Sequence, residues 1–156
     1  MSDVKKKFRE FFTSLEKRGR ADKFEIVSEE EMQEFIHDFP LIKLPKAYIE
    51  FMRYAGHGQY WIGSDYSIKK VKHLQEPARE LLDENGFPHK LREDDFVFYM
   101  HQGYNFCFFN LNESDNPQVY YYDEGEDMDD FVKCGDDFFD AVTGNSYPLG
   151  LILGRR

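Results

Sequence analysis

The sequence has few of the features that mark membrane, secreted or zinc-binding proteins. Its 156 residues include only two cysteines, Cys107 and Cys134. Two cysteines fit a reducing compartment, although one disulfide between them remains possible, and they cannot form a zinc site by themselves. No stretch approaches the roughly 20 apolar residues of a membrane-spanning helix. The N-terminal Met-Ser-Asp-Val-Lys-Lys-Lys lacks the apolar region of a secretion signal. We therefore expect a cytoplasmic protein with no membrane partner.

Basic residues are scarce in the C-terminal part of the chain. Residues 1–92 carry 17 Lys/Arg and 16 Asp/Glu, whereas residues 93–156 carry 3 Lys/Arg and 14 Asp/Glu, within an overall net charge of -10. Such an acidic segment repels phosphate, which argues against nucleic acid as a partner. It would attract a basic protein and speed its association.

Signatures of catalysis and of cofactor binding are also missing. There is no H-E-x-x-H, G-x-S-x-G, Walker A or G-x-G-x-x-G motif. The five histidines form no ligand pattern: His37, His57, His73, His89 and His101. Cys107 stands among phenylalanines, where an apolar setting raises the pKa of a thiol, so it is expected in the core and not as a nucleophile. The sequence predicts no catalytic residues, no metal site and no cofactor, and we do not expect an enzyme.

Aromatic residues are abundant, with 16 Phe and 10 Tyr, so we expect a core built from rings. Apolar spacing at the helical period predicts helices over residues 3–18, 28–37, 45–55, 77–85 and 136–142. Ser28 and Glu31 match a capping box, and Pro45 suits the first position of a helix.

The apolar period changes to that of strands at residue 96. Strands are predicted over residues 96–101, 104–109 and 118–123, with Gln102-Gly103 as the first turn. Adjacent hairpins make an antiparallel sheet. Helices, then a meander, then a final helix predict one α+β domain over residues 1–156, with a largely antiparallel twisted sheet packed by N-terminal helices and a closing C-terminal helix.

The most conspicuous polar feature is the acidic segment 123–130, which directly follows Tyr120, Tyr121 and Tyr122. It is not an EF-hand, because Gly125 stands at its third position instead of the sixth. A solvated loop with adventitious cation binding and a recognition surface for a basic partner both remain open. Strand alternation puts Tyr121 on the opposite face from its two neighbours, so tyrosine either lies exposed beside the carboxylates or is covered by helices as core.

If the segment is a recognition surface for a basic partner, tyrosine supplies the contact area of the interface and the carboxylates supply its charge. The candidate partner-binding residues are Tyr120, Tyr121, Tyr122, Asp123, Glu124, Glu126, Asp127, Asp129 and Asp130. Four further carboxylates are candidate neighbours of this surface: Asp94, Asp95, Asp136 and Asp137.

Several motifs, in this order, resemble the SUKH superfamily of bacterial immunity proteins and of the yeast Smi/Knr cell-wall regulator. Leu44-Pro45-Lys46-Ala47-Tyr48-Ile49-Glu50-Phe51-Met52, followed by Gly56-His57-Gly58, is similar to the family's L-P-x-x-Y-x-x-F helix and its glycine turn. Three later segments also resemble the family, in the same order: the hairpin over 98–109, the strand that begins at Pro117 and the final helix with Phe138 and Phe139. The resemblance covers about residues 28–143.

The resemblance implies a Smi/Knr-like α+β domain that binds a cognate toxin domain, often a nuclease, and blocks its active or substrate-binding surface without catalysis. We expect such a partner to have a basic surface, and the protein to be a monomer or a small homo-oligomer. The alternative is an interaction or regulatory scaffold of the same fold with no toxin partner. The tail 144–156, with its apolar Leu149, Leu151, Ile152 and Leu153, has no counterpart in the resemblance.

Overall fold

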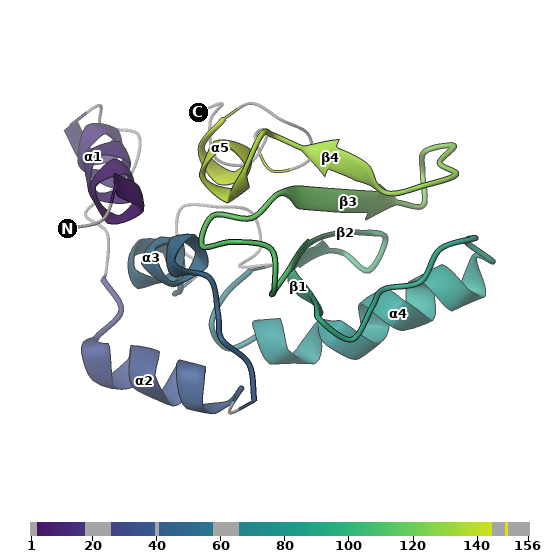
Figure 1. Cartoon of the computed structure of the whole chain (residues 1–156), viewed down its shortest axis with the longest axis horizontal. Coiled ribbons are helices and arrows are strands. Elements are labelled where there is room, and N and C mark those ends of the chain that lie inside the picture. Colours follow the sequence, from purple (N-terminus) through teal and green to yellow (C-terminus); the bar gives the residue numbers. More distant parts are fainter. Residues whose placement is uncertain (1–2, 18–25, 40, 58–65, 145–148, 150–156) are drawn as a thin grey trace.

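The computed structural model describes residues 3–17, 26–39, 41–57, 66–144 and 149. In this part of the chain, helices precede a four-stranded antiparallel sheet in the order β1-β2-β3-β4, and a short helix follows it (Figure 1). The predicted α+β class, antiparallel meander and closing helix are confirmed.

The N-terminal helices begin and end close to the predicted residues. They are α1 (Asp3–Lys17), α2 (Glu29–His37) and α3 (Lys46–Ala55). The Ser28 Oγ accepts a hydrogen bond of 3.1 Å from the Glu31 N–H, as a helix N-cap should. Pro45 precedes α3 as its N-cap residue, so this helix begins one residue later than predicted.

The helix α4 (Gln75–Glu84) begins earlier than predicted, directly after the short 3-10 helix η2 (Val71–His73). Pro77 is therefore in the first turn and not at its start. The N–H groups of a first turn have no acceptor within the helix, so a proline there removes no hydrogen bond.

The strands are β1 (Asp95–His101), β2 (Asn105–Asn110), β3 (Val119–Asp123) and β4 (Val132–Cys134). Gln102 and Gly103 form the β1–β2 turn with positive φ values of 49° and 75°, the backbone of a type I′ hairpin turn. The strand β4 was not predicted. Its three residues, Val-Lys-Cys, are too few to establish an alternating pattern.

A β-bulge interrupts the pairing of β1 with β2. Val97 is opposite Phe108 and Tyr99 is opposite Cys107, so Phe98 has no partner in the register. As a result, two consecutive rings, Phe98 and Tyr99, join the same core cluster.

Helices cover the two faces of the sheet unequally. The first face packs against α1, α2, α3 and the closing helix α5 (Phe138–Thr143). The second face packs against α4, which lies along β1 and leaves the β3–β4 side of this face less covered (Figure 1). Leu149 is buried in the first cluster, whereas Leu151, Ile152 and Leu153 lie outside the described residues.

The predicted core of rings is confirmed on the first face, where Tyr48 of α3 is central. Its ring centroid lies 5.3 Å from that of Phe109, 5.6 Å from that of Phe96 and 5.8 Å from that of Phe138. The family-like Leu-Pro-x-x-Tyr segment thus brings α3, the sheet and α5 together around one tyrosine.

Candidate functional site

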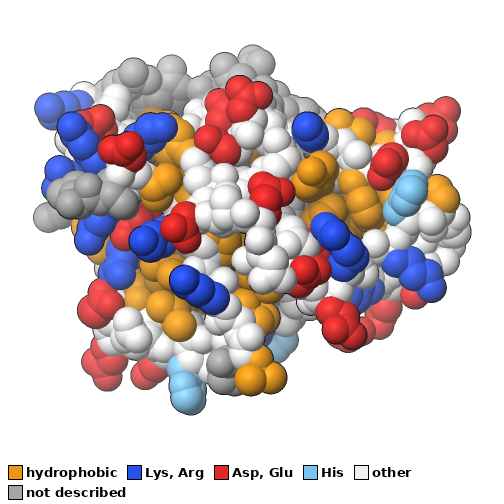
Figure 2. Space-filling model, viewed as in Figure 1, with side chains coloured by type: hydrophobic (Ala, Val, Ile, Leu, Met, Phe, Trp, Pro, Cys, Tyr) orange, Lys and Arg blue, Asp and Glu red, His pale blue; other side chains and the backbone are white. Residues whose placement is uncertain are grey.

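The acidic loop (residues 124–130) connects β3 to β4 at one end of the sheet. It carries five exposed carboxylates: Glu124, Glu126, Asp127, Asp129 and Asp130. Figure 2 shows Asp and Glu side chains at this end of the molecule, with some Lys and Arg side chains near them, while Lys and Arg side chains gather over α1 at the opposite end. The basic side chains are therefore concentrated away from the acidic loop.

The loop has a defined conformation built around Asp123 and Met128. The Asp123 side chain, buried at the end of β3, accepts a 2.8 Å hydrogen bond from the Gly125 N–H. The Asp123 carbonyl accepts another from the Glu126 N–H at 3.1 Å, and the Asp123 N–H donates to the Met128 Sδ at 3.3 Å. Met128 packs against both core clusters, so it anchors the middle of the loop.

Two other segments hold the first residue of the loop. The Glu124 N–H donates to the Tyr104 carbonyl at 3.0 Å, which joins the loop to the β1–β2 turn. The Asn85 Nδ2, at the C-terminus of α4, donates to the Glu124 Oε2 at 3.0 Å and to the Tyr122 hydroxyl at 3.0 Å. The loop is thus tied to a helix and to a hairpin.

The three tyrosines before the loop alternate between the faces, and two of them are covered. Tyr121 is 8 % exposed in the first cluster and Tyr122 is 4 % exposed in the second. Tyr120 is half-buried, and its ring stacks on Phe108 with centroids 5.6 Å apart. Among the predicted residues, Tyr121, Tyr122 and Asp123 therefore lie in the core, and the others reach the surface.

Tyr121 is connected to the loop through its hydroxyl group. This hydroxyl donates to the Glu126 Oε1 at 3.2 Å. Burial, and then the neighbouring Glu126 carboxylate, raises the pKa of Tyr121 to about 12. The phenol therefore stays neutral and fixes one of the five carboxylates.

The four carboxylates predicted as neighbours do not lie beside the tip of the loop. Asp95 pairs with Asn110 at one end of the sheet, whereas Asn105 pairs with Asp123 at the other. Asp94 adjoins the first end, and Asp136 and Asp137 follow β4 at that same end. The strand register separates these residues from Asp127 and Asp129, so the expectation that they extend the acidic surface there is wrong, whereas Asp95 lines a groove together with Asp130, the last residue of the loop.

A groove of about 290 Å³ lies on the less covered part of the second sheet face. Phe108, Tyr120 and Phe131 form its apolar part, and the rings of Phe108 and Phe131 are 4.8 Å apart. Its lining also holds His89 and charged residues of both signs: Lys90, Arg92, Asp95, Glu113 and Asp130. Asp130 belongs to both the groove and the acidic loop, and its Oδ1 lies 3.7 Å from the His89 Nε2.

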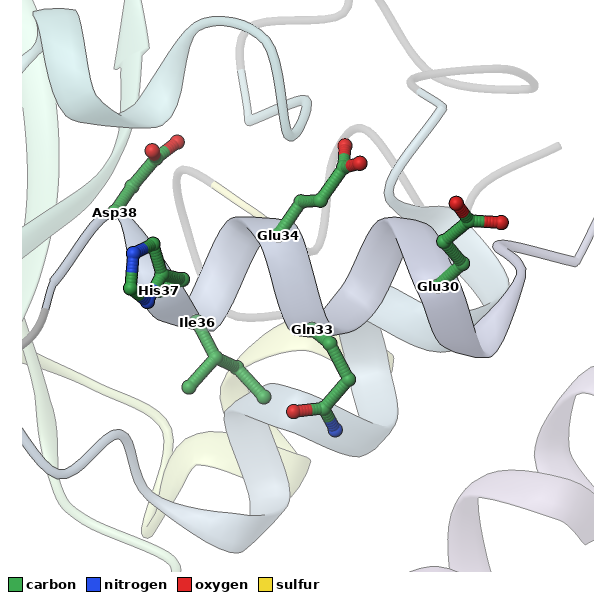
Figure 3. Close-up of a pocket in the computed structure, with 6 residues that line it drawn as sticks. All are labelled: Glu30, Gln33, Glu34, Ile36, His37 and Asp38. Carbon is green, nitrogen blue, oxygen red and sulfur yellow. The ribbon is translucent and has the colours of Figure 1, made fainter.

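A second depression lies along α2, where Figure 3 shows Glu30, Glu34 and Asp38 on one side of the helix and Gln33 and Ile36 on another. The Asp38 carboxylate pairs with Lys72 at 3.7 Å. The side chains diverge from the helix, so this depression brings no set of catalytic groups together.

The buried thiols fit a structural role. Cys107 and Cys134 are both fully buried, and burial raises the pKa of Cys107 well above its ordinary value. Within the described ranges, no three His, Cys, Asp or Glu side chains are grouped so that they could hold a metal ion. In the same ranges, no helix has the length and apolar character needed to cross a bilayer.

The residues of the loop and groove that the sequence did not single out are Asn85, Tyr104, Phe108 and Phe131. Tyr104 and Phe131 are far in sequence from the residues they meet, and only the strand register reveals those contacts. Asn85 had one local signal, its place before Gly86 at the end of a helix.

The fold is thus an α+β domain with a fixed acidic loop at one end and an aromatic groove beside it. The chain belongs to the SMI1 / KNR4 family (SUKH-1), whose model matches residues 26–143. This match confirms the resemblance in the α3 segment, the hairpin and the closing helix. The curated proteins and the solved structures contain no match to the chain.

Proposed function

We propose that the protein is a non-catalytic immunity protein that binds a toxin domain and blocks its active or substrate-binding surface. The family supports a protein of this general kind. The observation that carries the proposal is the acidic loop, because five exposed carboxylates on a fixed loop suit the basic surface with which a nuclease would hold its substrate.

In this proposal the partner meets Asp127 and Asp129 at the tip of the loop first. Hydrogen bonds hold the Glu124 and Glu126 side chains against the domain, and the Asp130 carboxylate accepts a hydrogen bond from the Phe131 N–H; these three residues complete the surface around the tip. Tyr120 and the groove beside Asp130 supply apolar contact area. Tyr121 and Tyr122 contribute by supporting the loop from within the core, and Asp123 fixes its first turn.

The test begins with the product of the adjacent gene, co-expressed with the intact protein and captured on it. Asp127→Lys with Asp129→Lys is expected to weaken binding by at least tenfold and to restore the toxin's activity. Glu30→Lys with Glu34→Lys is the matched control, because it makes the same change in net charge on exposed residues of α2. Equal effects of the two pairs would show that overall charge, and not the acidic loop, controls binding.

A second candidate function is an interaction or regulatory scaffold without a toxin. The family name covers SMI1 and KNR4, and the acidic loop would serve any basic protein partner. If the adjacent gene product does not bind and has no toxic activity, the scaffold is favoured over the immunity protein.

A further inference from the structure

We propose that Asn85 is the positioning residue of the acidic loop, and that it acts through Glu124. The proposal concerns the conformation of the loop before any partner arrives. Its consequence for binding rests on the proposed function.

Asn85 is itself held rigidly at the end of α4. Its N–H donates to the Leu81 carbonyl at 3.1 Å, and the Phe87 N–H donates to the Leu82 carbonyl at 3.0 Å. Gly86 has a φ of 62° between them. This arrangement is a Schellman-type helix end, which needs the left-handed residue and fixes the direction of the chain.

One amide group then serves two different partners. The two N–H bonds of the Asn85 Nδ2 point to the Tyr122 hydroxyl in the core and to the Glu124 carboxylate at the surface. The Tyr122 ring packs edge-on against Phe87 at 4.8 Å, so this contact is already fixed by α4. The bond to Glu124 is therefore the contact through which the helix holds the loop.

The reason to fix Glu124 lies in the charge of the loop. Five carboxylates within seven residues repel one another, which favours a spread-out loop. Lys90 and Arg92 line the groove at the Asp130 end of the loop, whereas segments 80–87, 101–105 and 123–126, which surround Glu124, contain no Lys or Arg to offset this repulsion. A neutral donor from α4 holds the first carboxylate without neutralising it, so the loop keeps its charge for a partner and loses less conformational entropy on binding.

Hydrogen exchange on the full chain tests the positioning without any partner. Asn85→Ala is expected to speed exchange of the Glu124, Gly125 and Glu126 amides about three- to tenfold, since it removes one solvent-exposed hydrogen bond to a carboxylate. Amides of β2 should be unchanged. Asn112→Ala is the matched control, because Asn112 makes the same kind of bond to Asp94 at the other end of the sheet.

Asn85→Asp separates the two partners of the amide. A carboxylate at this position cannot donate to the Tyr122 hydroxyl, but it can accept a hydrogen bond from that hydroxyl and so keep the contact, while it repels Glu124. Exchange at least as fast as in Asn85→Ala supports action through Glu124, whereas restored protection would overturn the proposal. In the double variant Asn85→Ala, Glu124→Ala, the loop amides should exchange at the same rates as in Glu124→Ala alone. Additive effects of the two substitutions on these rates would also overturn the proposal.

Binding to the captured partner gives the second measurement. Asn85 is uncharged, so Asn85→Ala should leave the association rate and its salt dependence unchanged and raise the dissociation rate about three- to tenfold. If the loop loosens but no partner binds the intact protein, the proposed function fails and the positioning role stands. If protection of the loop is unchanged by Asn85→Ala, the positioning role fails by itself.

Discussion

The side chain of Gln75 pairs with the backbone of Val97 as a neighbouring strand would. Its Oε1 accepts from the Val97 N–H at 3.0 Å, and its Nε2 donates to the Val97 carbonyl at 2.7 Å. Val97 adjoins the bulge on the outer strand of the sheet, where unpaired backbone groups would invite pairing with another chain. Gln75 therefore closes this edge from the first turn of α4.

Loss of the Gln75 amide should destabilise the folded protein. Gln75→Leu leaves the N–H and the carbonyl of Val97 without partners, and we expect the free energy of unfolding to fall by about 2–3 kcal/mol. Urea titration measures the loss. Gln33→Leu, which removes only an exposed bond to Glu29, should change it by less than about 0.5 kcal/mol. Similar losses in both variants would contradict the role given to Gln75.

Among the residues that the structure describes, the Tyr48 hydroxyl finds no hydrogen-bond partner, although its side chain is fully buried. Removing an unpaired polar group from a core relieves its desolvation cost. Tyr48→Phe is therefore expected to leave stability unchanged or to raise it by about 1 kcal/mol. In contrast, Tyr121→Phe breaks the bond to Glu126 and should lower stability by about 1 kcal/mol. Thermal unfolding of the two variants checks the contrast, and a destabilising Tyr48→Phe would contradict it.

Tyr121 should contribute to alkaline unfolding. Its pKa is about 12 in the folded protein, above the ordinary value of 10.0, so folding favours the neutral phenol. The associated stability is fully present below pH 10 and is lost as the pH rises towards 12. Tyr121→Phe should therefore lose less stability than the intact protein between pH 10 and 12. Cys107 and Tyr48, whose pKa values are also raised, remain in both proteins, so the difference isolates Tyr121.

Both thiols should be inert while the protein is folded. Cys107 and Cys134 are fully buried, and the pKa of each is raised, that of Cys134 to about 11. A thiol-specific reagent at neutral pH should modify neither on the timescale of minutes and both after unfolding in denaturant. Rapid modification of one cysteine in the native protein would contradict the burial described for it.

If the acidic loop guides association, salt should slow binding to the captured partner. Exposed charges are screened over about 8 Å at physiological ionic strength. We expect the association rate to fall severalfold between low and physiological salt, and the Asp127→Lys, Asp129→Lys variant to lose most of this dependence. Stopped-flow measurements at several salt concentrations test this. An unchanged dependence in the variant would place the binding surface elsewhere.

Local patterns in the sequence were sufficient for the helices and for three strands. Phe8, Phe12 and Leu15 follow one helical face, and Ser28 marks a helix start by the chemistry of its own side chain. The bulge at Phe98 has no comparable signature in the sequence, because a run of consecutive apolar residues shows the same pattern whether or not it contains an extra, unpaired residue. It depends on the partner strand, which the local pattern does not contain.

The acidic loop could be located from the sequence, but its construction could not. The segment 123–130 stands out by charge alone, and the resemblance to the family gave no role to its residues. That Tyr121 and Tyr122 are covered depends on α4 and on the helices of the first face, which pack on both sides of β3. That Asn85 meets Glu124 depends on α4 ending level with the loop, across 39 positions of sequence.

The bulge at Phe98 also bears on how this chain can change in length. Because Phe98 has no partner in β2, its deletion would join Val97 to Tyr99 in regular pairing, and each residue beyond would keep its face and its neighbour. Elsewhere in β1, the loss of one residue moves all the following side chains to the opposite face of the sheet. A relative shorter by one residue at this point can therefore retain the same sheet with one ring fewer in its core, and comparisons of family members should place a gap here.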